Sequence, residues 1–237
     1  MRSIAIIPAR GESKRIPRKN IKDFLGKPII AYSIEAALNS GLFDEVMVST
    51  DDINIANIAK KIGAEVPFMR THKNADDYAT TVEVLLEVIH NYEAIGMSFK
   101  YGCCIYPTAP FVTPEILLKS KELLVQKEYD CVFPVLQFSS PIQRALQMNP
   151  DGRIEMFYPE FQTIRSQDLP PAYHDSGQFY WFDILALKKN KQLWTHNTGA
   201  IPLSALQAHD IDNEEDWSIA EFKFQITFGK NKNKGNA

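Results

Sequence analysis

Short, continuous hydrophobic runs alternate with runs of helical period along the first 138 residues. A continuous run indicates a strand buried on both faces, and an i, i+3, i+4, i+7 spacing indicates a helix with one buried face. The runs predict strands at residues 3–9, 45–50, 64–69, 101–106 and 131–138. Helices are predicted at residues 28–39 and 53–62, behind the capping box Thr80-x-x-Glu83, and from Thr113 onward. Strands and helices that alternate in this way are typical of βαβ units and a mostly parallel sheet.

The alternation stops between residues 139 and 176, a stretch rich in Pro, Gln, Arg and Tyr. We expect an insertion here, built as a β-hairpin with extended arms. Regular structure resumes at residues 178–182, which are strongly β-prone, and a last helix is predicted at residues 213–228. These patterns divide the chain into a core of residues 1–138 and 177–229, an insertion of residues 139–176 and a flexible tail of residues 230–237.

The composition excludes several classes of protein. Of the 237 residues, 45% are hydrophobic and 23% are charged, which is ordinary globular usage, and the net charge of −3 argues against a nucleic-acid-binding surface. The sequence has neither a signal peptide nor an apolar run near the roughly 20 residues of a membrane span, so we expect a cytoplasmic protein with no membrane partner. Cys103, Cys104 and Cys131 lack the spacing of a zinc site or a disulfide framework, so we expect them buried and reduced.

Charged residues are concentrated in the loop that follows the first predicted strand. Between residues 10 and 27, seven basic residues stand against two acidic ones, which indicates a focused anion site. Gly11 permits a tight turn, and Arg10, Lys14 and Lys19 can reach different phosphates of a triphosphate. The loop has neither a Walker A nor a GxGxxG pattern. The alternative is a solvated basic loop, but the carboxyl end of a buried strand favours the phosphate interpretation.

This loop also carries a resemblance. The run Ile7-Pro8-Ala9-Arg10-Gly11-x-Ser13-Lys14-Arg15-Ile16-Pro17-x-Lys19-Asn20, followed by Leu25-Gly26-Lys27-Pro28, resembles the signature of the acylneuraminate cytidylyltransferases. The resemblance implies a Mg²⁺-dependent enzyme that transfers CMP from CTP to an acidic sugar. It also implies a three-layer, Rossmann-like nucleotidyltransferase fold and a homodimer joined through the insertion. Glu12 stands where the family has a second glycine, which keeps open a non-catalytic nucleotide-binding sensor.

The resemblance extends to a second segment, from Arg70 to Thr81, where Ala75, Asp77 and Ala79 stand at family-like spacing. The implied nucleotide-binding residues are Ala9, Arg10, Gly11, Lys14, Lys19, Asn20, Arg70, Ala79 and Thr81. From the residues alone, a surface position for Arg70 and a capping role for Thr81 are the favoured interpretation of this second segment.

Asp210 and Asp212 form the strongest acidic pair in the sequence. Residues two apart in an extended segment share a face, and carboxylate oxygens are ligands that Mg²⁺ accepts. The alternative is that Asp212-x-x-Glu215 caps the last helix. The resemblance implies that the pair binds Mg²⁺ and forms the catalytic set together with Arg10, Lys14 and Lys19.

Around the insertion, Gln143-Arg144, Arg165–Pro170 and Tyr173–Trp181 match the family in order. The form His174-Asp175-x-Gly177-Gln178-Phe179-Tyr180-Trp181, with Tyr106 where sialate-using members carry Gln, is similar to enzymes for pseudaminic acid, a diacylated, 9-deoxy nine-carbon ulosonic acid. Sialic acid, legionaminic acid and octulosonate are the alternative substrates. The implied sugar-binding residues are Tyr106, Arg144, Arg165, His174, Gln178 and Tyr180. The two arginines suit the sugar carboxylate, and His174 is a candidate general base or a simple hydrogen-bonding group.

Overall fold

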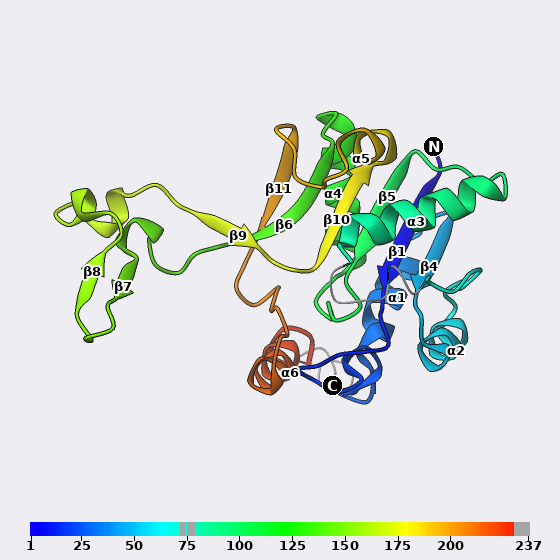
Figure 1. Ribbon diagram of the computed structural model, residues 1–237, viewed down its shortest axis with the longest axis horizontal. Coiled ribbons are helices and arrows are strands. Elements are labelled where there is room, and N and C mark those ends of the chain that lie inside the picture. The colour runs from blue at the N-terminus through cyan, green and yellow to red at the C-terminus, as the bar shows by residue number, and fades with distance from the viewer. Residues whose placement is uncertain (72–73, 75–78, 230–237) are drawn as a thin grey trace, which may run out of the picture.

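The computed structural model describes residues 1–71, 74 and 79–229. The predicted tail, residues 230–237, and Ala75 and Asp77 of the predicted nucleotide segment lie outside the described residues. A seven-stranded sheet forms the centre of the molecule, in the order β11-β6-β10-β5-β1-β4, with β9 beside β6 (Figure 1). Its strands are β1 (Ser3–Pro8), β4 (Glu45–Ser49), β5 (Tyr101–Ile105), β6 (Cys131–Gln137), β9 (Tyr173–Asp175), β10 (Phe179–Asp183) and β11 (Thr198–Leu203).

The pairing of these strands confirms the predicted α/β fold with a mostly parallel sheet. β1 lies parallel to β4 and β5, and β6 lies parallel to β11. β10 runs antiparallel between β5 and β6, so only β10 and β9 are reversed. The strand predicted at residues 64–69 is wrong, because only Glu65 bridges to Met47. Pro67 has no backbone N–H to continue such a ladder.

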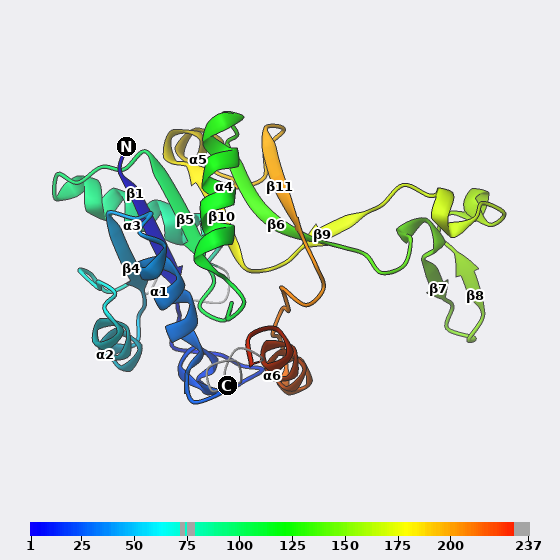
Figure 2. The ribbon, with the colours of Figure 1, turned by 180° about the vertical axis from the view of Figure 1, so that it is seen from behind.

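Helices cover both faces of the sheet in three layers. α1 (Ile29–Ser40), α2 (Ile53–Ile62) and α4 (Pro114–Gln126) pack on one face, and α3 (Thr81–Ala94) and α5 (Ile184–Asn190) pack on the other (Figures 1 and 2). α1 ends at Gly41, whose φ of 63° suits a residue without a Cβ. Thr80 and Glu83 form the predicted capping box of α3. Within the described residues, no helix combines the length and the apolar character that a bilayer crossing requires.

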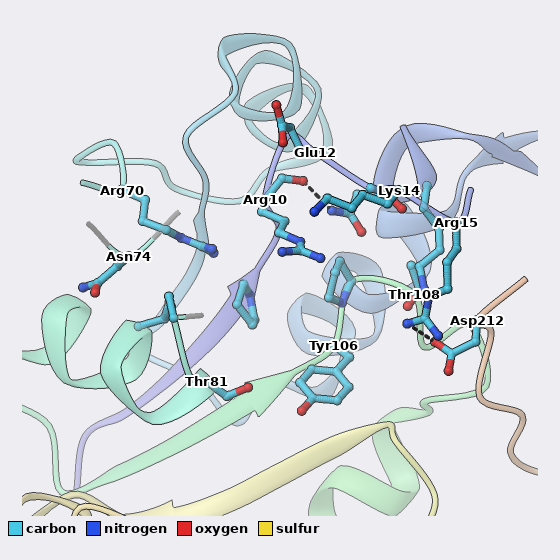
Figure 3. Close-up of a pocket in the computed structure, with 17 residues that line it drawn as sticks. Arg10, Glu12, Lys14, Arg15, Arg70, Asn74, Thr81, Tyr106, Thr108 and Asp212 are labelled. Carbon is cyan, nitrogen blue, oxygen red and sulfur yellow. Dashed lines mark hydrogen bonds and ion pairs between the residues drawn. The ribbon is translucent and has the colours of Figure 1, made fainter. Parts of the chain in front are cut away.

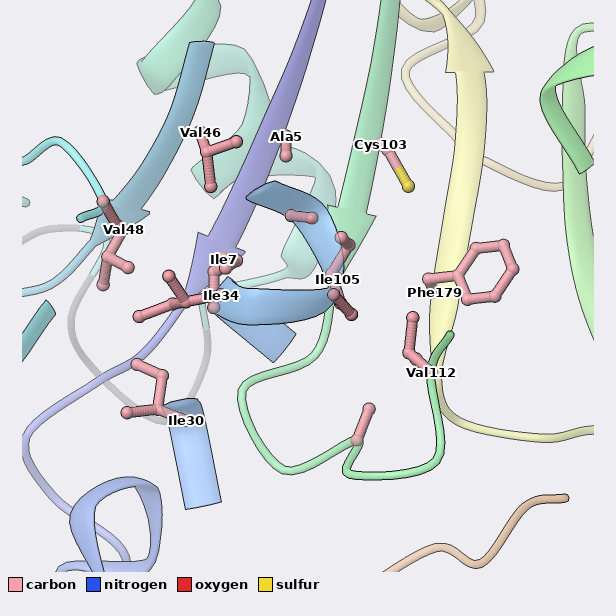
Figure 4. Packing of buried hydrophobic residues seen from close by; sticks show 14 of the residues in the cluster. Ala5, Ile7, Ile30, Ile34, Val46, Val48, Cys103, Ile105, Val112 and Phe179 are labelled. Carbon is pink, nitrogen blue, oxygen red and sulfur yellow. The ribbon is translucent and has the colours of Figure 1, made fainter. Parts of the chain in front are cut away.

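The two helical layers have separate cores. Ile30 and Ile34 of α1 pack over Ile7 of β1 and Ile105 of β5, as Figure 4 shows. Burial of each such side chain contributes about 1.5–3 kcal/mol. The three cysteines are buried and free, as expected; the neighbouring Cys103 and Cys104 point to opposite faces, one into each core.

The last helix, α6 (Glu214–Phe228), joins the N-terminal loop rather than the sheet. Its Trp217 packs in a third apolar cluster with Ile16 and Phe24, two residues of the loop region. That region also contains a 3-10 turn, Lys19–Ile21, and a small ladder of β2 (Asp23–Phe24) and β3 (Lys27–Pro28). Asn213 caps α6 and forms a capping box with Asp216. The alternative that Asp212 caps α6 is therefore wrong, because the cap is the next residue, Asn213. The Asp212 carboxylate takes no part in the capping.

The insertion leaves the sheet after β6 and extends far from it (Figures 1 and 2). It contains the expected hairpin, formed by β7 (Leu146–Met148) and β8 (Ile154–Met156), and 3-10 turns at Ile142–Arg144, Pro159–Phe161 and Ser166–Asp168. At its end, β9 pairs with β6, so the last residues of the predicted insertion belong to the main sheet. α5 and β11 were not predicted.

Candidate active site

The loop after β1 is held in place by its backbone. The Ala9 N–H donates to the Ser49 carbonyl over 2.9 Å, and the Gly11 N–H donates to Asp51 Oδ1 over 2.8 Å. The buried Asn20 donates from Nδ2 to the Arg10 carbonyl over 2.8 Å. Ala9, Gly11 and Asn20 thus shape the loop, and a Cβ on Gly11 would come within 2.9 Å of the Asp52 Cβ.

A cavity of about 530 Å³ opens between this loop, the start of α3 and the end of β5 (Figure 3). The predicted site residues that line it are Arg10, Lys14, Lys19, Asn20, Arg70, Ala79, Thr81, Tyr106 and Asp212. The basic loop and the acidic segment near Asp212 therefore line the same cavity. The structure adds Ser13, Arg15 and Thr108 to this lining. The Glu12 carboxylate is at the rim and points away from Arg10 and Tyr106 (Figure 3).

Arg70 is anchored on the end of β4. Its Nε donates to Ser49 Oγ over 3.1 Å, and its Nη2 donates to the Ser49 carbonyl over 2.5 Å. Burial lowers the pKa of the Arg70 guanidinium, and the nearby Asp51 and Glu87 oppose that shift. The alternative of a free surface arginine is therefore wrong.

The acidic pair lies against two cations of the loop. Arg15 Nη2 is 2.8 Å from Asp212 Oδ1, and Lys19 Nζ donates to the Ile211 carbonyl. Ile211 is fully buried, so Asp210 and Asp212 point to the opposite side of the chain from it. Burial, followed by repulsion from Asp212, raises the pKa of Asp210. Burial also lowers the pKa of Lys19, against the attraction of both carboxylates.

The two carboxylates repel each other, and their oxygens are ligands that a divalent cation accepts. Burial is the main cause of the raised pKa of Asp210, and repulsion from Asp212 adds to it; a bound cation would relieve that repulsion. In the part of the chain that the structure describes, no three His, Cys, Asp or Glu side chains gather as a ready-made metal site. An octahedral ion would therefore take its other oxygens from phosphates and water. Asp210 does not line the cavity itself; its Cγ would lie 3.3 Å from a Cβ on Gly177, whose φ is 65°.

A second cavity, of about 420 Å³, adjoins the first. Thr81 and Tyr106 line both cavities, and Tyr180 lines the second. The rings of Tyr106 and Tyr180 meet edge to face with centroids 5.6 Å apart. The sequence interpretation missed the other lining residues, Thr80, Val82, Asp175, Lys191, Gln192, Leu193 and Trp194. Four of these follow α5, a seven-residue helix too short to give a periodic signal.

Two predicted sugar-binding arginines lie far from both cavities, in the insertion. Arg144 Nη2 donates to the Ile164 carbonyl, and Arg165 Nε pairs with Asp168 Oδ2 at 2.8 Å. Both arginines are exposed and contact only their own arm in these bonds. The structure therefore does not bring them to the cavities of their own chain.

His174 and Gln178 also do not line either cavity. His174 Nδ1 lies 2.8 Å from the Asp175 carbonyl, and its ring packs against Phe138 on an exposed surface. Gln178 is buried behind the cavities and donates from Nε2 to the Gln207 carbonyl over 2.9 Å. This arrangement gives His174 no path to a reacting group in either cavity.

Comparison with known families supports the resemblance seen in the loop. The family model described as Cytidylyltransferase matches residues 4–149, more than half of the chain. The chain belongs to the cytidylyltransferase family. This cytidylyltransferase is 41% identical over 226 residues to the pseudaminic acid cytidylyltransferase of Campylobacter jejuni, covering 95% of this chain and 97% of the relative. It is 30% identical over 226 residues to the CMP-N,N'-diacetyllegionaminic acid synthase of Legionella pneumophila, covering 93% and 95%.

A solved structure shares the fold of this cytidylyltransferase. CMP:2-keto-3-deoxy-manno-octonic acid synthetase complexed with CTP superposes with a TM-score of 0.71 and covers 96% of this chain and 100% of that chain. Because the sequence identity is 17%, this likeness supports the fold alone. The predicted family and the predicted nucleotidyltransferase fold are both confirmed.

Proposed function

We propose that the protein transfers CMP from CTP to the anomeric hydroxyl of a nine-carbon ulosonic acid, pseudaminic acid, and releases pyrophosphate. The observation that carries the proposal is that Lys14 and Asp212 line one cavity, which shares Thr81 and Tyr106 with a second one. Ligand pockets of about 300–1,000 Å³ hold one compact ligand. The first cavity, of about 530 Å³, therefore suits the nucleotide, and the second, of about 420 Å³, suits the sugar.

In the first cavity, CTP lies with its phosphates over the loop. Arg10, Lys14 and Lys19 supply positive charge to the phosphate oxygens. Ala79, Asn20 and the anchored Arg70 are placed further along the cavity to hold cytosine and ribose. The deep anchoring of Arg70 and the backbone bonds of the loop keep these groups fixed before the nucleotide arrives, which is how positioning lowers a barrier.

Asp210 and Asp212 would hold Mg²⁺, which, when bound, neutralises charge on the phosphate oxygens and favours attack at the α-phosphorus. The chain's own cations complement this site. Arg15 contacts Asp212, and Lys19 is attracted to both carboxylates, so the acidic segment stays close to the loop.

The second cavity offers aromatic and aliphatic surface to the sugar. Tyr106, Tyr180, Leu193 and Trp194 suit the methyl groups of a diacylated, deoxygenated sugar better than a highly hydroxylated one. Lys191 adds one positive charge to this cavity for an acidic substrate.

The insertion, residues 139–176, is assigned to a homodimer. Its hairpin exposes apolar side chains that nothing covers among the described residues, including Met148 at 71% and Ile154 at 57%. A second copy seated on this arm would bury them. It would also bring Arg144 and Arg165 of one chain to the other chain's sugar cavity, where their forks suit a carboxylate.

Pyrophosphate release with CTP and a panel of ulosonic acids tests the function. We expect the highest kcat/KM with pseudaminic acid and lower values with legionaminic acid, sialic acid and octulosonate, and a CMP-sugar of matching mass. UTP in place of CTP is the control for the base. A higher kcat/KM with another acid would replace the substrate, and CTP binding without turnover for every acid would identify a sensor. The outward direction of Glu12 argues against the sensor.

A further inference from the structure

Two side chains mark the junction at which the proposed substrates meet. Among the described residues that line either cavity, only Thr81 and Tyr106 line both. If CTP fills the first cavity and the sugar fills the second, the attacking hydroxyl and the α-phosphorus must meet at this junction. Both residues carry a hydroxyl group, which can accept a proton and donate another at the same time.

From this junction a chain of hydroxyls leads into the protein. The rings of Tyr106 and Tyr180 meet edge to face with centroids 5.6 Å apart, and both residues line the second cavity together with Thr81. Burial raises the pKa of Tyr106, and hydrogen bonding with Thr81 and Tyr180 opposes that rise. The Tyr180 hydroxyl, in turn, donates to Asp175 Oδ2. The other oxygen of Asp175 accepts the Gly177 N–H over 2.9 Å, so the carboxylate is held with one oxygen toward Tyr180. Tyr180 is only 5% exposed, which keeps water from interrupting the chain.

The other carboxylates at the two cavities are placed differently. The described lining residues include three carboxylates, those of Glu12, Asp212 and Asp175. Glu12 lies at the rim of the first cavity, on the side away from Tyr106, and Asp212 is paired with Arg15 at 2.8 Å. Of the three, Asp175 is the one that accepts a hydrogen bond from Tyr180, whose ring packs against Tyr106 at the junction.

We propose that Thr81, Tyr106 and Tyr180 form a proton relay that carries the proton of the attacking sugar hydroxyl to the Asp175 carboxylate. The inference rests on the proposed transfer reaction and names its proton acceptor. As the sugar oxygen forms its bond to the α-phosphorus, the bond from that phosphorus to pyrophosphate breaks. The sugar proton passes to the Thr81 oxygen, the Thr81 proton to Tyr106, the Tyr106 proton to Tyr180, and the Tyr180 proton to Asp175 Oδ2. Asp175 ends neutral and returns its proton to solvent, since β9 is partly exposed.

Tyr180→Phe and Asp175→Asn test the relay in the full-length enzyme. Loss of positioned general-base catalysis lowers rates by about 10²–10⁴-fold, so we expect each variant to lower kcat at least about 100-fold. The KM values for CTP and the sugar should stay within about twofold, because no phosphate or base contact is removed. Tyr173→Phe, which removes an exposed hydroxyl from the same strand as Asp175, is the matched control and should retain the wild-type kcat.

Two further measurements separate a relay from a structural role. Because both groups act on one proton path, the double variant should be no slower than the slower single variant. The wild type should show a curved dependence of kcat on the D₂O fraction, since several protons move together, and Tyr180→Phe should remove that curvature. Tyr180→Phe keeps its ring, so it still decides the question if Asp175→Asn fails to fold.

Three results would overturn the relay: a wild-type kcat in Tyr180→Phe, additive losses in the double variant, or a raised sugar KM with unchanged kcat. Each presupposes turnover by the wild type. A wild type that makes no CMP-sugar with any acid would instead remove the proposed function itself.

Discussion

The N-terminal loop and the insertion arm are both irregular and polar in sequence, but they find their contacts in different places. The loop buries Ile16 and Asn20 in its own chain and reaches Ile211 through Lys19, across 192 positions of sequence. The arm forms a hairpin whose apolar residues, such as Met148, remain exposed. The comparison teaches that the loop's contacts are complete within one chain, whereas the apolar side chains of the arm stay exposed there, as the proposed homodimer would require.

The largest effect is expected where the loop meets the acidic segment. Asp212→Asn removes a charge proposed to hold the cation, and loss of such electrostatic stabilisation costs about 10³-fold in kcat. Pyrophosphate release measures kcat, and calorimetric titration should find CTP binding changed far less. Asp151→Asn, in the arm, is the control for removing an acidic charge. Near-normal turnover in Asp212→Asn would remove the metal assignment.

A substitution on the apolar face of the arm should first prevent formation of the proposed homodimer. Met148→Asp places a charge on the exposed apolar face of the hairpin, so we expect a monomer by light scattering at micromolar concentration. Loss of the partner's arginines should then lower kcat/KM for the sugar about 100-fold, since a desolvated charge pair is worth several kcal/mol. CTP affinity should not change. Gln147→Asp, its neighbour on the alternate face of β7, is the control, and a Met148→Asp variant that still dimerises would contradict the arm assignment.

A smaller effect is expected in the sheet that supports the loop. A Cβ on Gly102 would lie 2.3 Å from Cζ of Phe182 on the neighbouring β10. Gly102→Ala should therefore lower the free energy of unfolding by about 1–3 kcal/mol. For a chain of this size, each kcal/mol lowers the Tm by about 2–4 °C in calorimetry. Gly229→Ala, whose Cβ would have its nearest neighbour at 3.9 Å, is the control and should leave the Tm nearly unchanged.

The smallest effect is expected at the rim of the loop. Because Glu12 is exposed at the rim of the cavity, Glu12→Gly should change kcat/KM for CTP by no more than about twofold, as for most exposed positions. Steady-state pyrophosphate release is sensitive enough for this test. A tenfold gain in kcat/KM would show that Glu12 opposes the triphosphate after all.

Local patterns predicted the elements that depend on near neighbours. α2 occupies the predicted residues because Asp52 caps its start and Gly63, with a φ of 108°, ends it. β11 and α5 were missed because a short edge strand and a seven-residue helix carry little periodicity. Residues 64–69 carried a strand-like pattern, but Pro67 interrupts the ladder.

The residues of the candidate site also differ in how far the sequence could predict their positions. Lys14 could be placed at the site because its loop follows the carboxyl end of a buried strand, whereas Asp212 was assigned to the same site through the resemblance alone. The contacts of Tyr180 with Tyr106 and Asp175 could not be predicted, since they depend on how β5, β9 and β10 pack side by side. Arg144 lines neither cavity of its own chain, and its proposed sugar contact requires the proposed homodimer.

The contact of Trp217 with Ile16 and Phe24 has a consequence for synthesis on the ribosome. The loop is made well before its apolar support in α6 and its acidic counterpart, since Lys19 and Ile211 are 192 positions apart in the sequence. A nascent chain can form much of its sheet while still tethered, yet it completes the proposed nucleotide pocket only after α6 has left the exit tunnel. A chain that ends before Asp210 should therefore fail to turn over CTP.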